Sequence, residues 1–496
     1  MENNKTLDLL RELLELSAIP ELMDIYEKIE NKINDFEKPL RIVITGMTKT
    51  GKSTLVNAFL QHYRAKTAVG VWTRCINWFK HVSYSPDGKE KCFVYYMDGR
   101  TEEHPIDSLA DFTDLDESKT DWREIFISHP ILLSFDLIDT PGMQSLIGDD
   151  SKKTAELLQR EDSKPDAYIY LMTREVEKVD IENIIMNVRG HNTIAAFTRC
   201  DWLPEGGPGP YEKEAKDVIT DKIENYPQIR YTFSRFFAIA ALYAQIAYTI
   251  TSEEIEQLRK MSAEDGIEFM LRDIDEFKGD DSLDKIISRS QREVLIDKME
   301  KEVILWSVRY FKEHEEASSE TFKQALLDYS NVVEMKDFVI RHFGGKRDFI
   351  KTDSIIKELI PLCTKCMRKA LPEARNRLQQ MLIRLNDFKI GFEKKYRLAI
   401  HLRDDYYCAG ENSKLLTDNE WQRALSLLGE KGDSVFERLG LEENVNSSVA
   451  LHICLEQINY WKKVVNKYSY LNPEAHKLAK DLLSVCEDLC LTIRKM

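Results

Sequence analysis

The stretch RIVITGMTKTGKS, from Arg41 to Ser53, decides the fold. RIVIT predicts a short buried strand, because three of its five residues are branched and apolar. GMTKTGKS matches the pattern G-x-x-x-x-G-K-[ST], and the run STLVNAFL that overlaps its end is compatible with a helix. A strand, a glycine-rich loop and a helix in this order are the context in which the pattern binds nucleoside triphosphates.

The residue types of this loop fit the phosphates of a nucleotide. Gly46 and Gly51 let the backbone turn, so that successive N–H groups point at the β-phosphate beside a helix N-terminus. Lys52 is expected to bridge the β- and γ-phosphates, and the Ser53 hydroxyl to bind Mg²⁺. The remaining loop residues are also expected at the nucleotide, namely Met47, Thr48, Lys49, Thr50 and Thr54.

A second motif, DTPG, spans Asp139 to Gly142 and ends the apolar run LLSFDLID. The Asp139 carboxylate is expected to hold Mg²⁺ through a water molecule, and the Gly142 N–H to donate to the γ-phosphate. A threonine between the two motifs should also reach Mg²⁺ and the γ-phosphate. Thr73 and Thr67 both fit, and Thr73 is favoured because GVWTRC lies in a loop directly before a strand.

A third motif, TRCD, predicts which base is bound. The Asp201 carboxylate can accept hydrogen bonds from N1–H and the exocyclic amine of guanine, a donor pair that adenine lacks. Thr198 begins the motif, and Arg199, where GTPases usually have lysine, can lie over the purine. After the run FFAIA, Ala240 and Ala241 occupy the place of a loop whose N–H contacts guanine O6. An ATP-binding protein remains the alternative if TRCD is only a turn.

Strands and helices alternate between about Pro39 and Tyr248. The expected strands are RIVIT, CINWFKHVSY, KCFVYYM, LLSFDLID, AYIYLM, TIAAFT and FFAIA. CINWFKHVSY and KCFVYYM are expected to pair, since the turn sequence SPDGKE joins them. The alternation predicts an α/β domain with a mostly parallel sheet. Residues 1–38 and 249–496 show helical spacing of apolar residues, which predicts an all-α bundle in which the two segments pack together.

The composition narrows the class of protein. The chain of 496 residues exceeds what one hydrophobic core usually supports, so at least two domains are expected. A net charge of -15 argues against a nucleic-acid partner. Nine scattered cysteines fit reduced thiols in a cytoplasmic protein. No apolar run approaches the roughly 18 residues of a transmembrane helix.

GMTKTGKSTLVNAFL, AVGVWTRCINWF, LIDTPG and TRCD together resemble the GTPase domain of dynamin-like large GTPases, most of all the bacterial dynamin-like proteins. The resemblance covers about residues 39–248, and the helical flanks match the family's neck and stalk. It implies a GTPase that converts GTP into GDP and phosphate with Mg²⁺. It also implies homodimers or larger assemblies formed through the GTPase domain, whose pairing moves the stalk in membrane remodelling.

The resemblance assigns roles within the motifs. Thr73, followed by Arg74, takes the place of the first switch. Lys49 lies where relatives place a residue that supplies or holds positive charge near the γ-phosphate, which phosphoryl transfer requires. Lys52, Thr73 and Lys49 are therefore the expected catalytic residues, unless Lys49 is only an exposed lysine on the loop rim. Gln144 is the nearest side chain to DTPG that can orient water.

Peripheral contact with a membrane is expected through residues 343–403. Between Lys365 and Arg403, eleven basic and three acidic residues give a net charge of +8. Basic helices attract anionic lipid headgroups, although the same charges can pair with acidic helices instead. The segment HFGGKRDFI predicts a helix-to-helix tip of the stalk near 343–350. The expected location is the cytoplasm, with peripheral contact at the membrane.

Two other functional classes remain open. One is a nucleotide-switched GTPase that acts on a protein partner without remodelling a membrane. The other is an RNA-associated GTPase of the Era-like kind, which the acidic composition disfavours.

Overall fold

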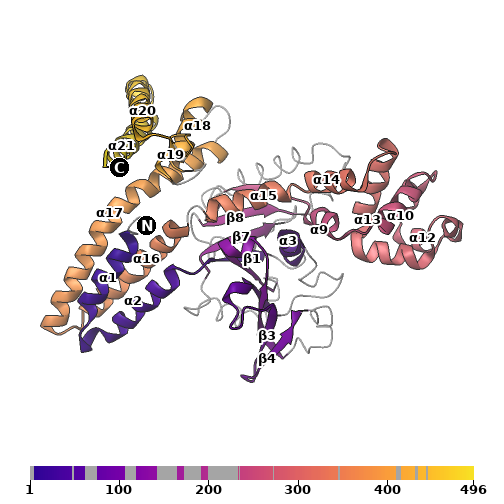
Figure 1. The fold of residues 1–496 in the computed structure, drawn as a ribbon, viewed down its shortest axis with the longest axis horizontal. Coiled ribbons are helices and arrows are strands. Elements are labelled where there is room, and N and C mark those ends of the chain that lie inside the picture. The colour runs from indigo at the N-terminus through magenta and orange to yellow at the C-terminus, as the bar shows by residue number, and fades with distance from the viewer. Residues whose placement is uncertain are drawn as a thin grey trace. The chain divides into compact units, whose positions relative to one another are not determined.

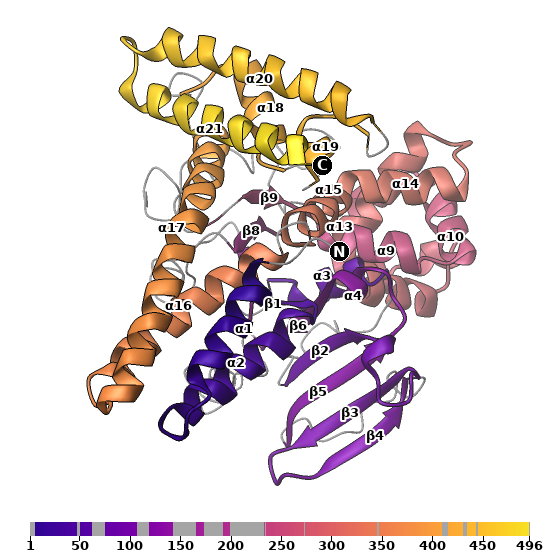
Figure 2. The same ribbon diagram turned by 60° about the vertical axis from the view of Figure 1, so that its left-hand side comes forward.

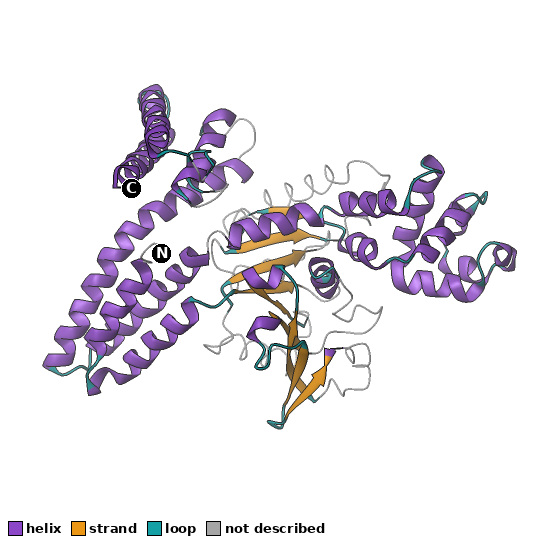
Figure 3. Cartoon of the chain, viewed as in Figure 1, coloured by secondary structure: helices purple, strands orange, loops and turns teal. Residues whose placement is uncertain are grey.

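The computed structural model describes residues 5–46, 50–61, 75–106, 119–141, 165–172, 192–198, 233, 235–271, 273–344, 347–408, 415–429, 434–442 and 445–495. The chain forms two compact units. The helical unit comprises Met1–Leu40 and Val339–Met496, and the sheet unit comprises Arg41–Phe338. All described strands belong to one sheet, as Figure 3 shows.

The sheet has nine described strands in the order β4-β3-β5-β2-β6-β1-β7-β8-β9. Their bounds are β1 Leu40–Gly46, β2 Ile76–His81, β3 Lys91–Tyr96, β4 Thr101–Pro105, β5 Thr120–Ile127, β6 Phe135–Asp139, β7 Ala167–Met172, β8 Thr193–Phe197 and β9 Phe236–Ala238. β1, β7, β8 and β9 are parallel neighbours, whereas β2 with β6 and β3 with β4 and β5 are antiparallel. The sheet is therefore mixed, with its parallel part around the glycine loop and a twisted extension through β5, β3 and β4 (Figure 2).

The expected pairing of residues 75–84 with 91–97 is wrong. β5, which the sequence patterns did not reveal, lies between β2 and β3. It runs parallel to β2 and antiparallel to β3, where the Trp122 ring stacks on Tyr95 with 4.0 Å between centroids. Cross-strand aromatic pairs of this kind stabilise the pairing of neighbouring strands.

Helices of the sheet unit surround and extend the sheet. Their bounds are α3 Lys52–Phe59, η2 Val82–Tyr84, α4 Ile131–Ser134, α9 Ala241–Thr249, α10 Ser252–Ser262, α11 Ile267–Met270, α12 Ile274–Gly279, η6 Asp281–Lys285, α13 Arg289–Glu313, α14 Ser319–Ser330 and α15 Val332–Val339. One buried core runs from Ala240 through Trp306 to Leu326. Because α9 contacts both α3 and α14, residues 249–338 lie in the sheet unit, whereas the sequence grouped them with the stalk.

The helical unit contains two cores. Its helices are α1 Lys5–Ser17, η1 Pro20–Leu22, α2 Met23–Phe36, η7 Ile340–Gly344, α16 Arg347–Met367, α17 Pro372–Cys408, α18 Asp418–Leu427, α19 Val435–Arg438, α20 Ser447–Tyr468 and α21 Pro473–Lys495. Apolar faces of α1 and α2 pack with α16 and α17 in the first core, side by side in Figures 1 and 2. The second core joins α18 to α21.

Several helices begin where the sequence provides a cap. Thr251 with Glu254, Ser288 with Gln291, and Thr417 with Glu420 each form a capping box that satisfies N–H groups of the first turn. The C-terminal end of α2 is also satisfied: the cationic side chains of Arg347 and Lys351 donate to the carbonyl oxygens there. The N-terminal helices are thus held by both apolar and polar contacts.

The structure places the end of the helical hairpin elsewhere than at residues 343–350. α16 and α17 are joined at residues 368–371, whereas Phe343 is fully buried and Phe349 stacks on Phe392 at 4.6 Å between centroids. The two phenylalanines therefore pack inside the helical unit and are not presented at a tip.

Most described cysteines lie inside the cores. Cys75 and Cys92 are buried in the sheet unit, and Cys363, Cys454 and Cys486 in the helical unit. Burial raises the pKa of Cys92, Cys363, Cys454 and Cys486 to about 12. In the described part of the chain, no helix has the length and apolarity to cross a membrane.

Candidate functional site

The glycine loop begins at the carboxyl end of β1, in the parallel part of the sheet. Gly46 has φ +146°, and a Cβ there would lie 2.3 Å from the Leu171 carbonyl oxygen of β7. Gly51 has φ +84° and caps α3. Both positions favour glycine, the first also because two strand backbones approach closely.

Lys52, Ser53 and Asp139, which the sequence predicts at a phosphate and Mg²⁺ site, lie together at this loop. The Lys52 ammonium donates to the Gly46 carbonyl oxygen at 3.3 Å. The Ser53 hydroxyl donates to Asp139 Oδ2 at 2.7 Å, across 86 positions of sequence. The first turn of α3 and the last residue of β6 therefore form one constellation.

Burial determines the electrostatics of this constellation. Desolvation lowers the pKa of Lys52 to about 8, although the Asp139 charge raises it. Desolvation likewise raises the pKa of Asp139 to about 6, against the Ser53 hydrogen bond and the Lys52 charge. A buried cation and a buried carboxylate of perturbed pKa at a strand end are typical of a functional site.

The donor set fits Mg²⁺. Asp139 Oδ1 is buried and, within the part of the chain that the structure describes, has no hydrogen-bond partner. A carboxylate oxygen and a serine hydroxyl are hard oxygen ligands, and Mg²⁺ commonly retains waters that bridge to such carboxylates. Ser53 would hold the ion directly and Asp139 through water, and the ion would neutralise charge on the β- and γ-phosphates.

Thr198 lies at the end of β8, where the guanine motif begins. Its N–H and hydroxyl both donate to the Met172 carbonyl oxygen of β7, at 2.8 and 3.1 Å. These bonds fix the direction in which the chain leaves the strand. Arg199 and Asp201 lie outside the described residues.

The loop after β9 differs from the expectation for Ala240. The Ala240 N–H donates to the Ser330 carbonyl oxygen of α14 at 3.0 Å, so it is engaged within the fold. Ala241 begins α9. Of this pair, Ala241 remains the candidate for guanine O6.

The other predicted site residues divide into two groups. Thr50 is 1% exposed at the base of the loop, and Thr54 follows in the first turn of α3. The remainder lie outside the described residues: Met47, Thr48, Lys49, Thr67, Thr73, Arg74, Gly142 and Gln144.

A polar connection behind the site was not predicted from the sequence. On α3, the Asn57 amide donates to Gln245 Oε1 of α9 at 3.1 Å, with both residues buried. At the end of α3, the Lys336 ammonium of α15 donates to the Phe59 carbonyl oxygen at 3.1 Å. The only signal was a polar residue within the apolar run LVNAF.

A buried ion pair links the N-terminal ends of two neighbouring parallel strands, β1 and β7. Arg41 Nε lies 3.1 Å from Asp166 Oδ2, and the two side chains are 7% and 6% exposed. The Arg41 N–H also donates to the same carboxylate, at 2.8 Å. The pair joins β1 to the residue before β7, and so supports the strand that carries the glycine loop.

A second buried carboxylate lies on β6. Asp136 accepts a hydrogen bond from Trp78 Nε1 at 2.9 Å. Burial raises its pKa to about 7, although Lys80 and the Trp78 bond lower it. Its charge is therefore costly to the fold at neutral pH.

Stability is expected to depend on the protonation of Asp136. Between its ordinary pKa of 3.8 and about 7, the folded protein binds the proton more tightly than the unfolded chain does. The free energy of unfolding therefore falls as pH rises through this window. Asp136→Asn should remove this fall and be more stable than the wild type at pH 8 by about 2–4 kcal/mol, with little difference at pH 4. Urea unfolding at both pH values checks this, and parallel pH profiles would contradict it.

Comparison with known proteins agrees with this geometry. Residues 42–198 match the model of the dynamin family. The chain is 23% identical over 461 residues to the isoniazid-induced protein IniC of Mycobacterium tuberculosis strains CDC 1551 and H37Rv, covering 89% of this chain and 88% of the relative.

The solved structures that match the chain have lower sequence identity to it. A chain from an oligomerised bacterial dynamin pair, described as providing a mechanism for long range sensing and tethering of membranes, is 14% identical with a TM-score of 0.37. The alignment covers 99% of this chain and 90% of that one. Era from Aquifex aeolicus is 14% identical over 41% of this chain and 52% of its own, with a TM-score of 0.23.

The family match confirms two predictions from the sequence. Residues 42–198 have the P-loop GTPase fold of the dynamin family, and the resemblance to dynamin-like GTPases holds. The protein is accordingly a GTP-hydrolysing enzyme.

Proposed function

We propose that this dynamin-like GTPase hydrolyses GTP with Mg²⁺ and uses the pairing of two GTPase domains to move its helices at a membrane. The constellation of the buried Lys52 and Asp139 with the half-buried Ser53 carries the proposal. It supplies a phosphate-facing cation beside hard oxygen ligands for Mg²⁺.

In this reaction water attacks the γ-phosphorus, and the bond to the β–γ bridging oxygen breaks to give GDP and phosphate. Lys52 and the loop N–H groups bind the phosphates and stabilise the charge that develops on them. Thr73 is proposed to contact Mg²⁺ and the γ-phosphate, and the Gly142 N–H to donate to that phosphate. When the γ-phosphate leaves, both residues would lose this contact and their segments would be free to move.

Base recognition is tested by Asp201→Asn. The asparagine amide oxygen can still accept from guanine N1–H. Its N–H₂ group, however, faces the exocyclic amine of guanine, and two donors cannot form a hydrogen bond with each other. GTP affinity should fall about a hundredfold, and xanthosine triphosphate, with an oxygen at that position, should bind better than to the wild type. Affinities for GTP, ATP and xanthosine triphosphate measure this. An unchanged preference for GTP would remove Asp201 from the base site.

Lys49 is proposed to supply positive charge in the paired GTPase domains. Turnover per molecule should rise with protein concentration in the wild type, and this rise should be reduced about tenfold or more in Lys49→Ala. Basal turnover of the dilute protein should change less. A stimulated rate equal to that of the wild type would show that Lys49 is only an exposed loop lysine.

Coupling between nucleotide and helices is proposed to pass through α3. This helix begins at the phosphates and is bound to α9 by Asn57 and to α15 by its last carbonyl. α9 in turn packs on α13 and α14. A shift of α3 on hydrolysis would therefore strain these hydrogen bonds and displace α9 and α15, because buried polar groups keep their partners in few arrangements.

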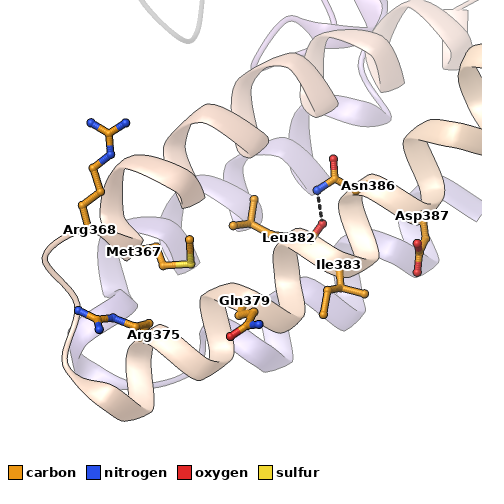
Figure 4. Close-up of a pocket in the computed structure, with 8 residues that line it drawn as sticks. All are labelled: Met367, Arg368, Arg375, Gln379, Leu382, Ile383, Asn386 and Asp387. Atoms are coloured by element: carbon orange, nitrogen blue, oxygen red, sulfur yellow. Dashed lines mark hydrogen bonds between the residues drawn. The ribbon is translucent and has the colours of Figure 1, made fainter.

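Membrane contact is proposed for the basic segment 343–403, chiefly at the turn between α16 and α17. Arg368, Lys369 and Leu371 are exposed there, Leu371 at 64%. A groove of about 620 Å³ lies beside the turn, with Arg368 and Arg375 at one end and Leu382 facing Met367 (Figure 4). Exposed cations beside apolar side chains suit anionic headgroups. Cytoplasmic location with peripheral membrane contact follows from this proposal.

A further inference from the structure

The turn that joins α20 and α21, residues 469–472, is fixed by its own polar bonds. The Leu471 N–H donates to the Tyr468 carbonyl oxygen at 3.2 Å. Asn472 accepts from the Ala475 N–H at 3.1 Å, and Pro473 follows as the first residue of α21. The two helices lie antiparallel in Figure 2, with this turn at one end of the hairpin.

The side chains at the tip of this turn are apolar and almost fully exposed. Tyr470 is 99% exposed and Leu471 is 74% exposed. Neither side chain is needed for the caps that shape the turn, so a polar residue would serve the fold equally well. Single exposed apolar residues are common, but two adjacent ones at the tip of an ordered hairpin form a protruding contact surface.

The helices on both sides of this tip carry cations. Residues 460–481 carry five lysines and two acidic residues, whereas the whole chain has a net charge of -15. The lysines are all exposed: Lys462, Lys463, Lys467, Lys477 and Lys480. Lys467 contacts Glu420 at 2.9 Å, and the other four point their charge to the surface on both helices. Protein interfaces are depleted in lysine, whereas anionic lipid surfaces attract it.

We propose that the α20–α21 turn is a membrane anchor, in which Tyr470 and Leu471 enter the interface of a bilayer that contains anionic lipid. Tyrosine suits this depth because its ring is apolar and its hydroxyl stays at the headgroups. Lys462, Lys463 and their neighbours contact those headgroups. This inference rests on the membrane role proposed above and adds a contact that depends on insertion, where the α16–α17 turn depends mainly on charge.

The test is co-sedimentation of the full-length protein with vesicles of phosphatidylcholine, with and without phosphatidylglycerol. Tyr470→Ser combined with Leu471→Ser should lower partitioning into mixed vesicles about tenfold or more, and Tyr470→Trp should retain it. Lys462→Gln with Lys463→Gln should lower binding to mixed vesicles about tenfold and leave the weak binding to pure phosphatidylcholine unchanged. Basal GTP turnover in solution should be unaltered by all three.

A matched control exists on the same hairpin. Val449 and Leu491, 47% and 55% exposed, lie at its opposite end, so replacing both by serine removes two exposed apolar side chains of the same hairpin without touching the tip. This control should bind vesicles like the wild type. Equal losses in control and tip variants, or none in the tip variant, would overturn the anchor while the wild type still bound membranes. A wild type that hydrolyses GTP but binds no vesicle would overturn the membrane role itself. If the tip variant changed oligomeric state without vesicles, the turn would be a protein interface.

Discussion

Replacing Lys52 with methionine is expected to lower GTP turnover about a thousandfold while leaving the nucleotide-free protein folded and about as stable as the wild type. The rate falls because the only cation placed at the loop by the described residues is lost. Stability is retained because burial lowers the Lys52 pKa to about 8, so its charge costs the empty fold free energy. Methionine keeps the aliphatic stem that packs there.

Single-turnover kinetics and thermal melting measure the two effects separately. Lys336→Met is the matched control, since it also removes a partly buried lysine, whose pKa burial lowers, at the other end of α3. By the same argument the control should change stability little, and its effect on the chemical step should be smaller because Lys336 lies away from the loop. A Lys52→Met protein with turnover within tenfold of the wild type would contradict the phosphate role.

Asp166→Ala is expected to lower the free energy of unfolding of the sheet unit by about 3–5 kcal/mol. The substitution leaves the Arg41 guanidinium buried beside β1 without the carboxylate that lies 3.1 Å away. Replacing both partners, as Arg41→Met with Asp166→Leu, should recover most of the loss, because no uncompensated charge remains.

Urea unfolding followed by tryptophan fluorescence measures this, since Trp78 and Trp122 belong to the same sheet. Glu293→Ala serves as the control: Glu293 pairs with Arg289 at 3.2 Å on the surface of α13. An exposed pair contributes little, so the control should stay within about 0.5 kcal/mol of the wild type. Similar small losses at both sites would show that the buried pair does not stabilise the strands.

The sequence predicted those parts of the site that short motifs determine. GMTKTGKS and DTPG lie far apart in the chain, yet Ser53 and Asp139 meet as expected because β1 and β6 are neighbours with the glycine loop at their edge. The backbone demands of Gly46 and Gly51 were readable because only glycine meets them readily.

Long-range packing was not readable in the same way. The turn SPDGKE indicated a hairpin, but β5 separates the two strands that it joins. Helical spacing after residue 249 predicted helices but not the core that they join. In the structure, α9 packs with the helices from α10 through α14 and so makes them part of the sheet unit. The Ala240 N–H was expected at guanine, but its partner Ser330 lies ninety residues further along the chain. Such partners follow from tertiary contacts that no local pattern encodes.

The buried cysteines give the protein an internal set of reporters. Cys75 and Cys92 lie in the sheet unit, Cys363 lies in the core shared by α1, α2, α16 and α17, and Cys454 and Cys486 lie in the core of α18 to α21. Thiols with a pKa near 12 react with alkylating reagents only when their surroundings open. The order in which these residues become labelled would therefore show which core opens first by local unfolding. The same measurement with GTP would show which core the nucleotide stabilises against opening.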